Sequence, residues 1–282
     1  MALRDRLGPY GVWHLEDAVT PELAAGLEDA GYGAVWLGQA APDLSGAERL
    51  LDATRTLVVA TGIVNVWQAG AEVVAAGFHR VAARHPDRLV VGVGTGHPEA
   101  HRQYAAPYRT LADFTAALLT AGVPADRLVL AALGPRVLRL AADRTAGAHP
   151  YLVPVEHTRR ARAAVGPGPL LVPEHAAVLD PDPASARARG RAGVDFPYLR
   201  LVNYRTNLRR LGWADADLAD GGSDALVDAL VAHGDAAAVA AGLAAHRAAG
   251  ADHVAIQLLA DDLLAGYREL APALGLTGPA AG

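Results

Sequence analysis

The chain of 282 residues contains no cysteine and no lysine. Without cysteine it cannot form disulfides, thiolate nucleophiles, or zinc and iron–sulfur sites that cysteine ligates. All 25 basic residues are arginine, so no protein lysine can form a Schiff base with a substrate or complete a Walker phosphate loop. The two absences together exclude several common enzyme chemistries, lysine-dependent aldol cleavage among them.

Long apolar runs and basic clusters are also lacking. No apolar run reaches the roughly 18 residues that a membrane helix needs, and the first residues do not have the pattern of a signal peptide, so we expect a cytoplasmic protein. The net charge is −5, and the longest basic cluster is 159–162, so nucleic acid is not an expected partner. Hydrophobic residues make up 52% of the chain and charged residues 20%, which is typical of a globular protein.

Short β-branched or apolar runs recur along the chain, and helical patterns follow most of them. Glu174 and His175, just after the seventh run, are interpreted as a turn at a strand end. The runs predict eight strands, at 10–13, 34–37, 57–60, 89–93, 128–131, 148–152, 169–172 and 253–256. Helices are predicted at 21–30, 47–54, 71–84, 111–121, 136–144 and 183–193.

Two helix starts carry capping signals. Thr20 precedes Pro21, which places a capping hydroxyl before a proline in the first helical turn. The segment 45–48 has a serine followed three residues later by a glutamate, the spacing of a capping box. Alternating strands and helices with continuous apolar strands predict a parallel sheet covered by helices. Eight such units in a chain of this length predict an α/β fold, a TIM-type (β/α)₈ barrel that forms one domain over residues 1–282.

The spacing breaks once, because about 80 residues separate the seventh predicted strand from the eighth. We expect a helical insertion there, over Asp195–Asp235, with an aromatic and polar stretch at 196–207. Loops that follow the strands of a barrel build its catalytic face, so the insertion is predicted to form a lid or substrate wall. The alternative is a dimer contact.

Glycines follow two of the predicted strands. The fourth strand ends in Gly92–His97, and Pro98 and Glu99 have the pattern of a helix start. Successive amides and a threonine hydroxyl at a helix start can cradle a phosphate. Gly134 and Pro135 form a second such turn after the fifth strand. Ordinary turns between strand and helix have the same composition, and the spacing matches neither a dinucleotide fingerprint nor a Walker loop.

The third strand is interrupted by Gly62, and a glycine within a strand indicates a bulge or a close backbone approach. The segments 61–65, 88–96 and 134–148 resemble the luciferase-like monooxygenase superfamily. More narrowly, they are similar to its oxidoreductases that depend on the deazaflavin coenzyme F420. The matching segments run in order over about residues 10 to 175 and again over the last strand and helix.

The resemblance implies a cofactor site and an activity. The Gly62–Ile63 peptide would be cis and would support the deazaflavin ring, with Asn65 nearby. The phosphate would be held by Gly94, Thr95 and Gly96, with Gly134 and Pro135 contributing from the next turn. The implied activity is hydride transfer between F420 and a small organic substrate, in a homodimer, since relatives are commonly dimers. The alternatives are an FMN-dependent monooxygenase and a deazaflavin carrier or sensor without turnover.

The proton partner of such a transfer requires a group that titrates near neutral pH, which favours histidine. His14 ends the first predicted strand, His97 follows the glycine loop, and His149 lies within the sixth predicted strand, so all three could face the catalytic mouth. We predict His97 as the catalytic partner, with His14 as the second candidate, because some relatives have an acidic residue at the position of His97. Residues 37–40 also depart from the family, which often has a polar pair after the second strand.

A metal site is not expected. His97 and His101 have the spacing of paired ligands on a helix, but the glutamate between them, Glu99, is not directly after the first histidine as a helical zinc motif requires, and Pro98 starts a helix only after His97.

Overall fold

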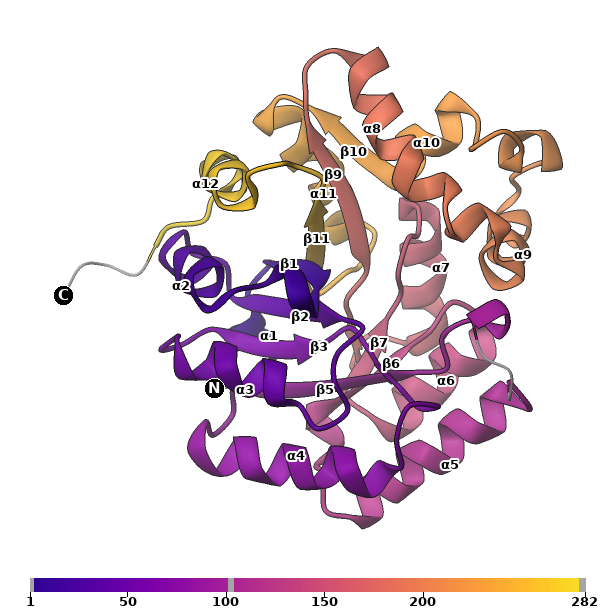
Figure 1. Ribbon diagram of the computed structural model, residues 1–282. Helices are drawn as coiled ribbons and strands as arrows, with labels where there is room; N and C mark the ends of the chain where they lie inside the picture. The colour runs from indigo at the N-terminus through magenta and orange to yellow at the C-terminus, as the bar shows by residue number, and fades with distance from the viewer. Residues whose placement is uncertain (1–2, 101–103, 279–282) are drawn as a thin grey trace.

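The computed structural model describes residues 3–100 and 104–278, and its strands form one parallel sheet surrounded by helices (Figure 1). In this part of the chain the strand order is β10-β9-β11-β1-β2-β3-β5-β6-β7-β8, and β4 pairs beside β5. The strands are β1 (Tyr10–Leu15), β2 (Ala34–Gly38), β3 (Val58–Thr61), β4 (Val64–Asn65), β5 (Leu89–Gly94), β6 (Leu128–Ala131), β7 (Gly147–His149), β8 (Leu170–Leu171), β9 (Glu174–Leu179), β10 (Val231–Gly234) and β11 (Val254–Leu258).

The sheet closes on itself because β8 and β9 are two parts of one extended run. β8 pairs with β7, and β9 pairs with β11. Between them, the Val172 amide donates to the Ala148 carbonyl at 2.9 Å, and the Pro173 carbonyl accepts from the Ala255 amide at 3.0 Å. The predicted TIM-type (β/α)₈ barrel is therefore confirmed, with β8 and β9 as its seventh strand.

Each of the eight predicted runs overlaps a strand, but three strands, β4, β9 and β10, lie outside these runs. The interpretation of Glu174 and His175 as a turn is wrong, because they begin β9. Pro173, directly before them, has the composition of a turn, yet its carbonyl takes part in the barrel ladder. β10 lies inside the segment predicted as helical and pairs with β9 in parallel.

The helices lie on the outside of the barrel (Figure 1). They are α1 (Leu3–Leu7), α2 (Pro21–Asp29), α3 (Ser45–Asp52), α4 (Ala71–Arg84), α5 (Pro107–Thr120), α6 (Pro135–Arg144), α7 (Val155–Val165), α8 (Pro183–Asp195), α9 (Val202–Leu211), α10 (Asp224–Leu230), α11 (Ala236–Ala248) and α12 (Leu263–Ala273). In the described residues no helix combines the length and the apolar character needed to cross a membrane.

One of the two predicted helix caps is confirmed. The Thr20 hydroxyl accepts from the Leu23 amide at 3.1 Å, and Pro21 stands in the first turn of α2. The predicted capping box is wrong, because Ser45 is already helical and Leu44 precedes it with a left-handed φ of 61°. The Asp43 carboxylate instead accepts from both the amide and the hydroxyl of Ser45.

The barrel interior holds a column of aromatic side chains. Leu7 of α1 is fully buried in the interior cluster at the amino-terminal ends of the strands. His253 donates from Nδ1 to the Gly8 carbonyl and accepts at Nε2 from the Trp36 indole, at 2.9 and 3.1 Å. The Trp36 ring then stacks on His149, with centroids 4.6 Å apart. The column leads from the closed end of the barrel toward the carboxyl ends of its strands.

The segment 195–235 contains more than helices. It holds a 3₁₀ turn (Tyr198–Arg200), α9, a second 3₁₀ turn (Asp215–Leu218), α10 and β10. Its apolar side chains form one buried cluster with Ala176 and Val178 of β9. The segment is thus packed directly on the barrel wall.

Candidate active site

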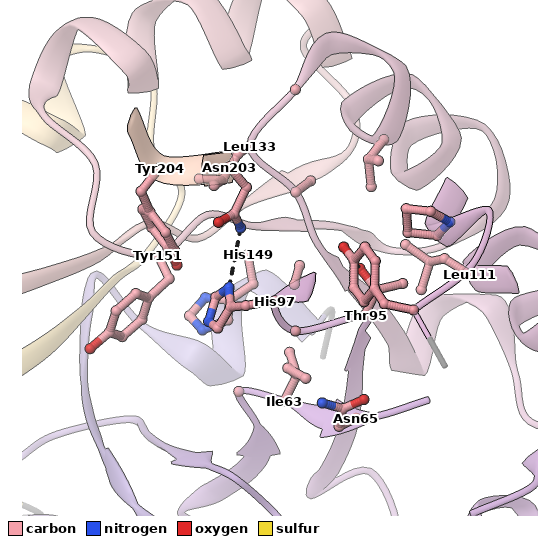
Figure 2. Close-up of a pocket in the computed structure, with 18 of the residues that line it drawn as sticks. Ile63, Asn65, Thr95, His97, Leu111, Leu133, His149, Tyr151, Asn203 and Tyr204 are labelled. Atoms are coloured by element: carbon pink, nitrogen blue, oxygen red, sulfur yellow. Dashed lines mark hydrogen bonds between the residues drawn. The ribbon is translucent and has the colours of Figure 1, made fainter. Parts of the chain in front are cut away.

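A cavity of about 520 Å³ opens at the carboxyl ends of the strands (Figure 2). Its walls come from the loops after β2, β3, β5, β6 and β7 and from the segment 195–235. The lining residues are Trp13, Gln39, Gly62, Ile63, Asn65, Gln68, Thr95, Gly96, His97, Tyr104, Pro107, Tyr108, Leu111, Ala131, Ala132, Leu133, Gly134, Val137, His149, Tyr151, Tyr198, Asn203 and Tyr204. None of these described residues is Asp, Glu or Arg, so the wall is free of permanent charge, and its side chains are aromatic, apolar or neutral and polar.

Most of the residues predicted for the site meet at this cavity, although the predicted helix start after the glycine loop is wrong. The predicted residues that line the cavity are Gly62, Ile63, Asn65, Thr95, Gly96, His97 and Gly134. Those that do not line it are His14, Gly94 and Pro135. Pro98–Ala100 form only a three-residue 3₁₀ turn, and α5 does not begin until Pro107.

Gly62 lies where three elements approach each other. Its peptide bond with Ile63 is cis, which confirms the prediction from the family resemblance. The Trp13 indole donates to the Gly62 carbonyl at 2.9 Å. A Cβ atom on Gly62 would lie 2.9 Å from both His149 Nε2 and Trp13 Nε1, closer than real Cβ atoms approach such groups. Only glycine fits this position without displacement of a neighbour.

The loops after β3 and β5 are tied together by hydrogen bonds. The Asn65 side-chain carbonyl accepts from the Trp67 amide at 3.0 Å, and the Trp67 indole donates to the Thr95 carbonyl at 2.8 Å. The Thr95 hydroxyl shares a hydrogen bond with the Tyr104 hydroxyl at 3.3 Å. Asn65 and Thr95 are therefore held at fixed positions on one side of the cavity.

Positive charge lies at the edge of the cavity rather than inside it. Gly134 caps the ten-residue helix α6, whose amino terminus favours an anion. The Arg210 guanidinium lies 3.4 Å from the point that a Cβ on Gly134 would occupy. The Arg136 guanidinium stacks 4.3 Å from the centre of the Tyr108 ring. The edge beside Gly134 therefore has the electrostatics of an anion site.

His97 is held by the segment 195–235. Its Nδ1 lies 3.2 Å from the side-chain amide nitrogen of Asn203, a contact that Figure 2 marks with a dashed line. The NH₂ nitrogen of an amide can only donate, so in this orientation of Asn203 Nδ1 accepts and the proton of the neutral ring resides on Nε2. The rings of Tyr198 and Tyr204 contact His97, with centroids 6.3 and 5.5 Å away. The segment thus supplies a wall of the cavity and fixes the tautomer of His97.

His149 lies deeper, at the inner end of the cavity. Its side chain is 2% exposed, and its Nδ1 lies 2.7 Å from the Val172 carbonyl. Its Nε2 has no hydrogen-bond partner among the described residues. Burial lowers the pKa of His149 to about 4, partly opposed by the Val172 carbonyl, so the ring is neutral near pH 7.

His14 does not reach the cavity, although it was the second candidate for proton transfer. It follows Trp13 on β1 and points to the opposite face, where its Nε2 lies 2.9 Å from the Tyr267 hydroxyl of α12. Burial lowers its pKa to about 4. The alternation of side chains along a strand places Trp13 inside the barrel and His14 outside it.

Glu174 is a buried acid that the sequence analysis did not place at any site. Its carboxyl group is fully buried and accepts from the Leu152 amide at 2.8 Å, while Oε1 has no partner among the described residues. Burial raises its pKa to about 8. Burial also raises the pKa of Tyr198 to about 12, and that of Tyr204 well above its usual value. These phenols remain protonated donors near neutral pH.

Several lining residues carried no signal that sequence reasoning used. Trp13, Tyr104 and Tyr108 belong to this group, since isolated aromatics are more often core residues. The described residues contain no group of three side chains that could hold a metal ion. His101, the second member of the histidine pair considered above, lies outside the described residues.

No protein-family model and no curated protein matches the chain, but solved structures do. An F420-dependent secondary alcohol dehydrogenase, solved with an F420–acetone adduct, has a TM-score of 0.73 at 15% identity, over 95% of this chain and 99% of that one. The F420-dependent tetrahydromethanopterin reductase of Methanopyrus kandleri has a TM-score of 0.72 at 12% identity, over 95% and 98%. The oxygenating constituent of 3,6-diketocamphane monooxygenase of Pseudomonas putida, in complex with FMN, has a TM-score of 0.66 at 12% identity, over 97% and 98%.

Proposed function

We propose that this chain, which has the fold of F420-dependent enzymes and of an FMN-containing monooxygenase, is an oxidoreductase of the luciferase-like superfamily. It would bind coenzyme F420 in the cavity and transfer a hydride between this cofactor and a small organic substrate. The observation that carries the proposal is the cavity itself, which brings the bulge at Gly62 and Ile63 together with the Thr95–Gly96 loop.

The residues present fit a tricyclic cofactor with a phosphate. A volume of about 520 Å³ lies within the range of cofactor sites, and the uncharged aromatic lining suits an uncharged ring. Arg136 and Arg210 lie at the edge beside Gly134, where the phosphate would meet positive charge and the amino terminus of α6.

Each part of the wall has a separate task in this proposal. Ile63 and Asn65 would contact the ring, and Thr95, Gly96 and Gly134 would hold the phosphate. Bound F420 supplies the hydride chemistry, while the protein orients the reactants and provides a proton partner. His97 is the proposed proton partner, because Asn203 fixes its ring and places a proton on Nε2.

The segment 195–235 would act as a substrate wall, since Tyr198, Asn203 and Tyr204 line the cavity. We expect Tyr198→Ala to change the KM values of substrates while cofactor affinity stays the same. A homodimer is also expected from the family resemblance, and sedimentation velocity of the purified protein tests it.

FMN is the second candidate cofactor, favoured by the similarity to a monooxygenase in complex with FMN. Titration of the cofactor-free protein with F420 and with FMN separates the two, because oxidised flavin has a second absorption band at longer wavelength. Tight binding of FMN alone would replace the F420 assignment. F420 binding without turnover on a broad panel of alcohols and ketones would indicate a carrier or sensor.

The phosphate site is tested by Gly96→Asp. Gly96 has a left-handed φ of 59° and lines the cavity, so the variant adds bulk and negative charge where the phosphate is proposed. We expect a loss of cofactor affinity of tenfold or more, on the order of 1.4 kcal/mol. Gly168→Asp is the control, since it adds the same charge before β8, at the opposite end of the barrel, where no atom lies within 4 Å of a new Cβ. Equal affinities of the two variants would place the phosphate elsewhere.

A further inference from the structure

The inner end of the cavity presents one hydrogen-bonding atom whose protein partner is missing. His149 lies among the lining residues, is 2% exposed, and has no hydrogen bond at Nε2 within the described chain. The same atom lies 2.9 Å from the point where Gly62 would carry a Cβ, so any side chain at position 62 would crowd Nε2. Buried polar atoms are rarely left without a partner, which indicates that a bound molecule supplies one.

The chemical character of this atom follows from its neighbours. A carbonyl oxygen can only accept, so the Val172 carbonyl at 2.7 Å holds the ring proton on Nδ1. The neutral ring then has a lone pair on Nε2, which makes this nitrogen an acceptor. Stacking on Trp36, with 23° between the ring planes, holds the plane of the imidazole, and the hydrogen bond to Val172 fixes which edge of the ring carries Nδ1.

Two other buried histidines of this barrel can be compared with His149. His253 uses both ring nitrogens, with the Gly8 carbonyl on one side and the Trp36 indole on the other. His157 resembles His149, since it lies against the Leu133 carbonyl and its other nitrogen has no partner in the described residues. His157 does not line the cavity, however, so His149 alone of these three can meet a ligand there.

We propose that His149 Nε2 accepts a hydrogen bond from a neutral O–H or N–H group of the molecule bound at the inner end of the cavity. A neutral group is required because the described lining residues include no Asp or Glu that could balance an ammonium ion and no Arg that could balance a carboxylate. His149 is thus a specificity-determining residue that selects ligands with a donor. This inference rests on the proposed function only in that the ligand is either the substrate or the cofactor.

Two sources can supply this donor, namely the hydroxyl group of a substrate alcohol or a ring N–H of the cofactor. Binding of two probe pairs distinguishes them. Benzyl alcohol and benzyl methyl ether, added to the cofactor-loaded protein, differ only in the hydroxyl donor. FMN and its N3-methylated analogue, added to the cofactor-free protein, differ only in the ring donor. We expect the wild type to prefer the donor-bearing member of one pair by about tenfold to a hundredfold.

His149→Phe keeps a ring against Trp36 and removes the acceptor. The variant should lose the preference that the wild type shows, by weaker binding of the donor-bearing member alone. His157→Phe is the matched control, since it also removes a buried imidazole that lies against a backbone carbonyl, and it should retain the preference. A His149→Phe protein that keeps the wild-type preference would overturn the proposal.

Nitrogen-15 NMR of histidine-labelled wild type tests the same proposal without a variant. The free protein should show His149 protonated on Nδ1 and not on Nε2, and the Nε2 resonance should move when benzyl alcohol or FMN binds. Binding of either molecule without movement of that resonance, or a His149 ring protonated on Nε2, would refute the proposal. A wild type that binds neither F420 nor FMN contradicts the proposed function. The two benzyl probes are then added to the cofactor-free protein, where the same preference for the alcohol, and its loss in His149→Phe, decides the role of His149.

Discussion

Glu174→Gln is expected to change how the stability of the barrel depends on pH. The Glu174 carboxyl group is fully buried, and among the described residues only the Leu152 amide donates to it. Burial raises its pKa to about 8, so the folded protein carries this side chain in the protonated, neutral form at pH 7. Glutamine has nearly the same shape as the protonated acid, and its side-chain carbonyl can accept the same hydrogen bond.

The size of the effect follows from the two pKa values. An unfolded chain ionises Glu174 near pH 4.5, whereas the folded chain retains the proton to about pH 8. Over that interval the free energy of unfolding of the wild type falls by about 1.4 kcal/mol for each pH unit. The stabilising contribution is complete below pH 4.5 and is lost as the pH rises to 8, a change of about 5 kcal/mol.

Urea unfolding of both proteins at pH values from about 5 to about 9 measures this difference. We expect similar stabilities near pH 5 and an advantage for Glu174→Gln that grows to several kcal/mol by pH 9. Glu28→Gln is the control of opposite sign. Burial alone would raise the pKa of Glu28, but the backbone amides of Thr56, Arg55 and Leu57 outweigh it and lower the pKa. Glu28→Gln should therefore be less stable than the wild type at pH 7, and this deficit should shrink as the pH falls.

A constant stability difference between wild type and Glu174→Gln from pH 5 to pH 9 would refute this reasoning. Such a result would mean that the Glu174 carboxylate ionises as readily in the folded chain as in the unfolded chain. It would also mean that donors other than the Leu152 amide stabilise its charge.

Two further predictions concern the cavity. Gly62→Ala places a Cβ 2.9 Å from His149 Nε2, so its free energy of unfolding should fall by about 1–3 kcal/mol in urea titrations. Gly193 lies in α8, where no described atom lies within 4 Å of a new Cβ, so Gly193→Ala should instead raise the free energy of unfolding by about 0.5–1 kcal/mol. Equal effects of the two changes would show that Gly62 is not tightly packed. His97→Ala should slow hydride transfer by about a hundredfold to ten-thousandfold without a change in cofactor affinity. Asn203→Ala should slow hydride transfer by a smaller factor. Wild-type turnover in His97→Ala would assign the proton to water or substrate.

The sequence by itself determined the barrel and the position of most of its loops. Eight apolar runs separated by helical patterns are a local signal, because a strand buried on both faces must be apolar along its whole length. The glycine at position 62 and the loop at 94–96 were also recognisable locally, since close backbone approach requires residues without a side chain. The absence of cysteine and lysine excluded whole classes of chemistry, because a missing side chain cannot act wherever the chain folds.

Only the tertiary structure decided which polar side chains meet. Neighbouring residues of a strand face opposite sides, and sequence composition did not show that His14 faces α12 while His149 faces the cavity. Asn203 reaches His97 across 106 positions of the chain, and no local pattern encodes that contact. The neutral state of Glu174 likewise arises from desolvation by elements far away in the sequence. Facing direction and desolvation are properties of the closed barrel, so they exist only once the distant strands have paired.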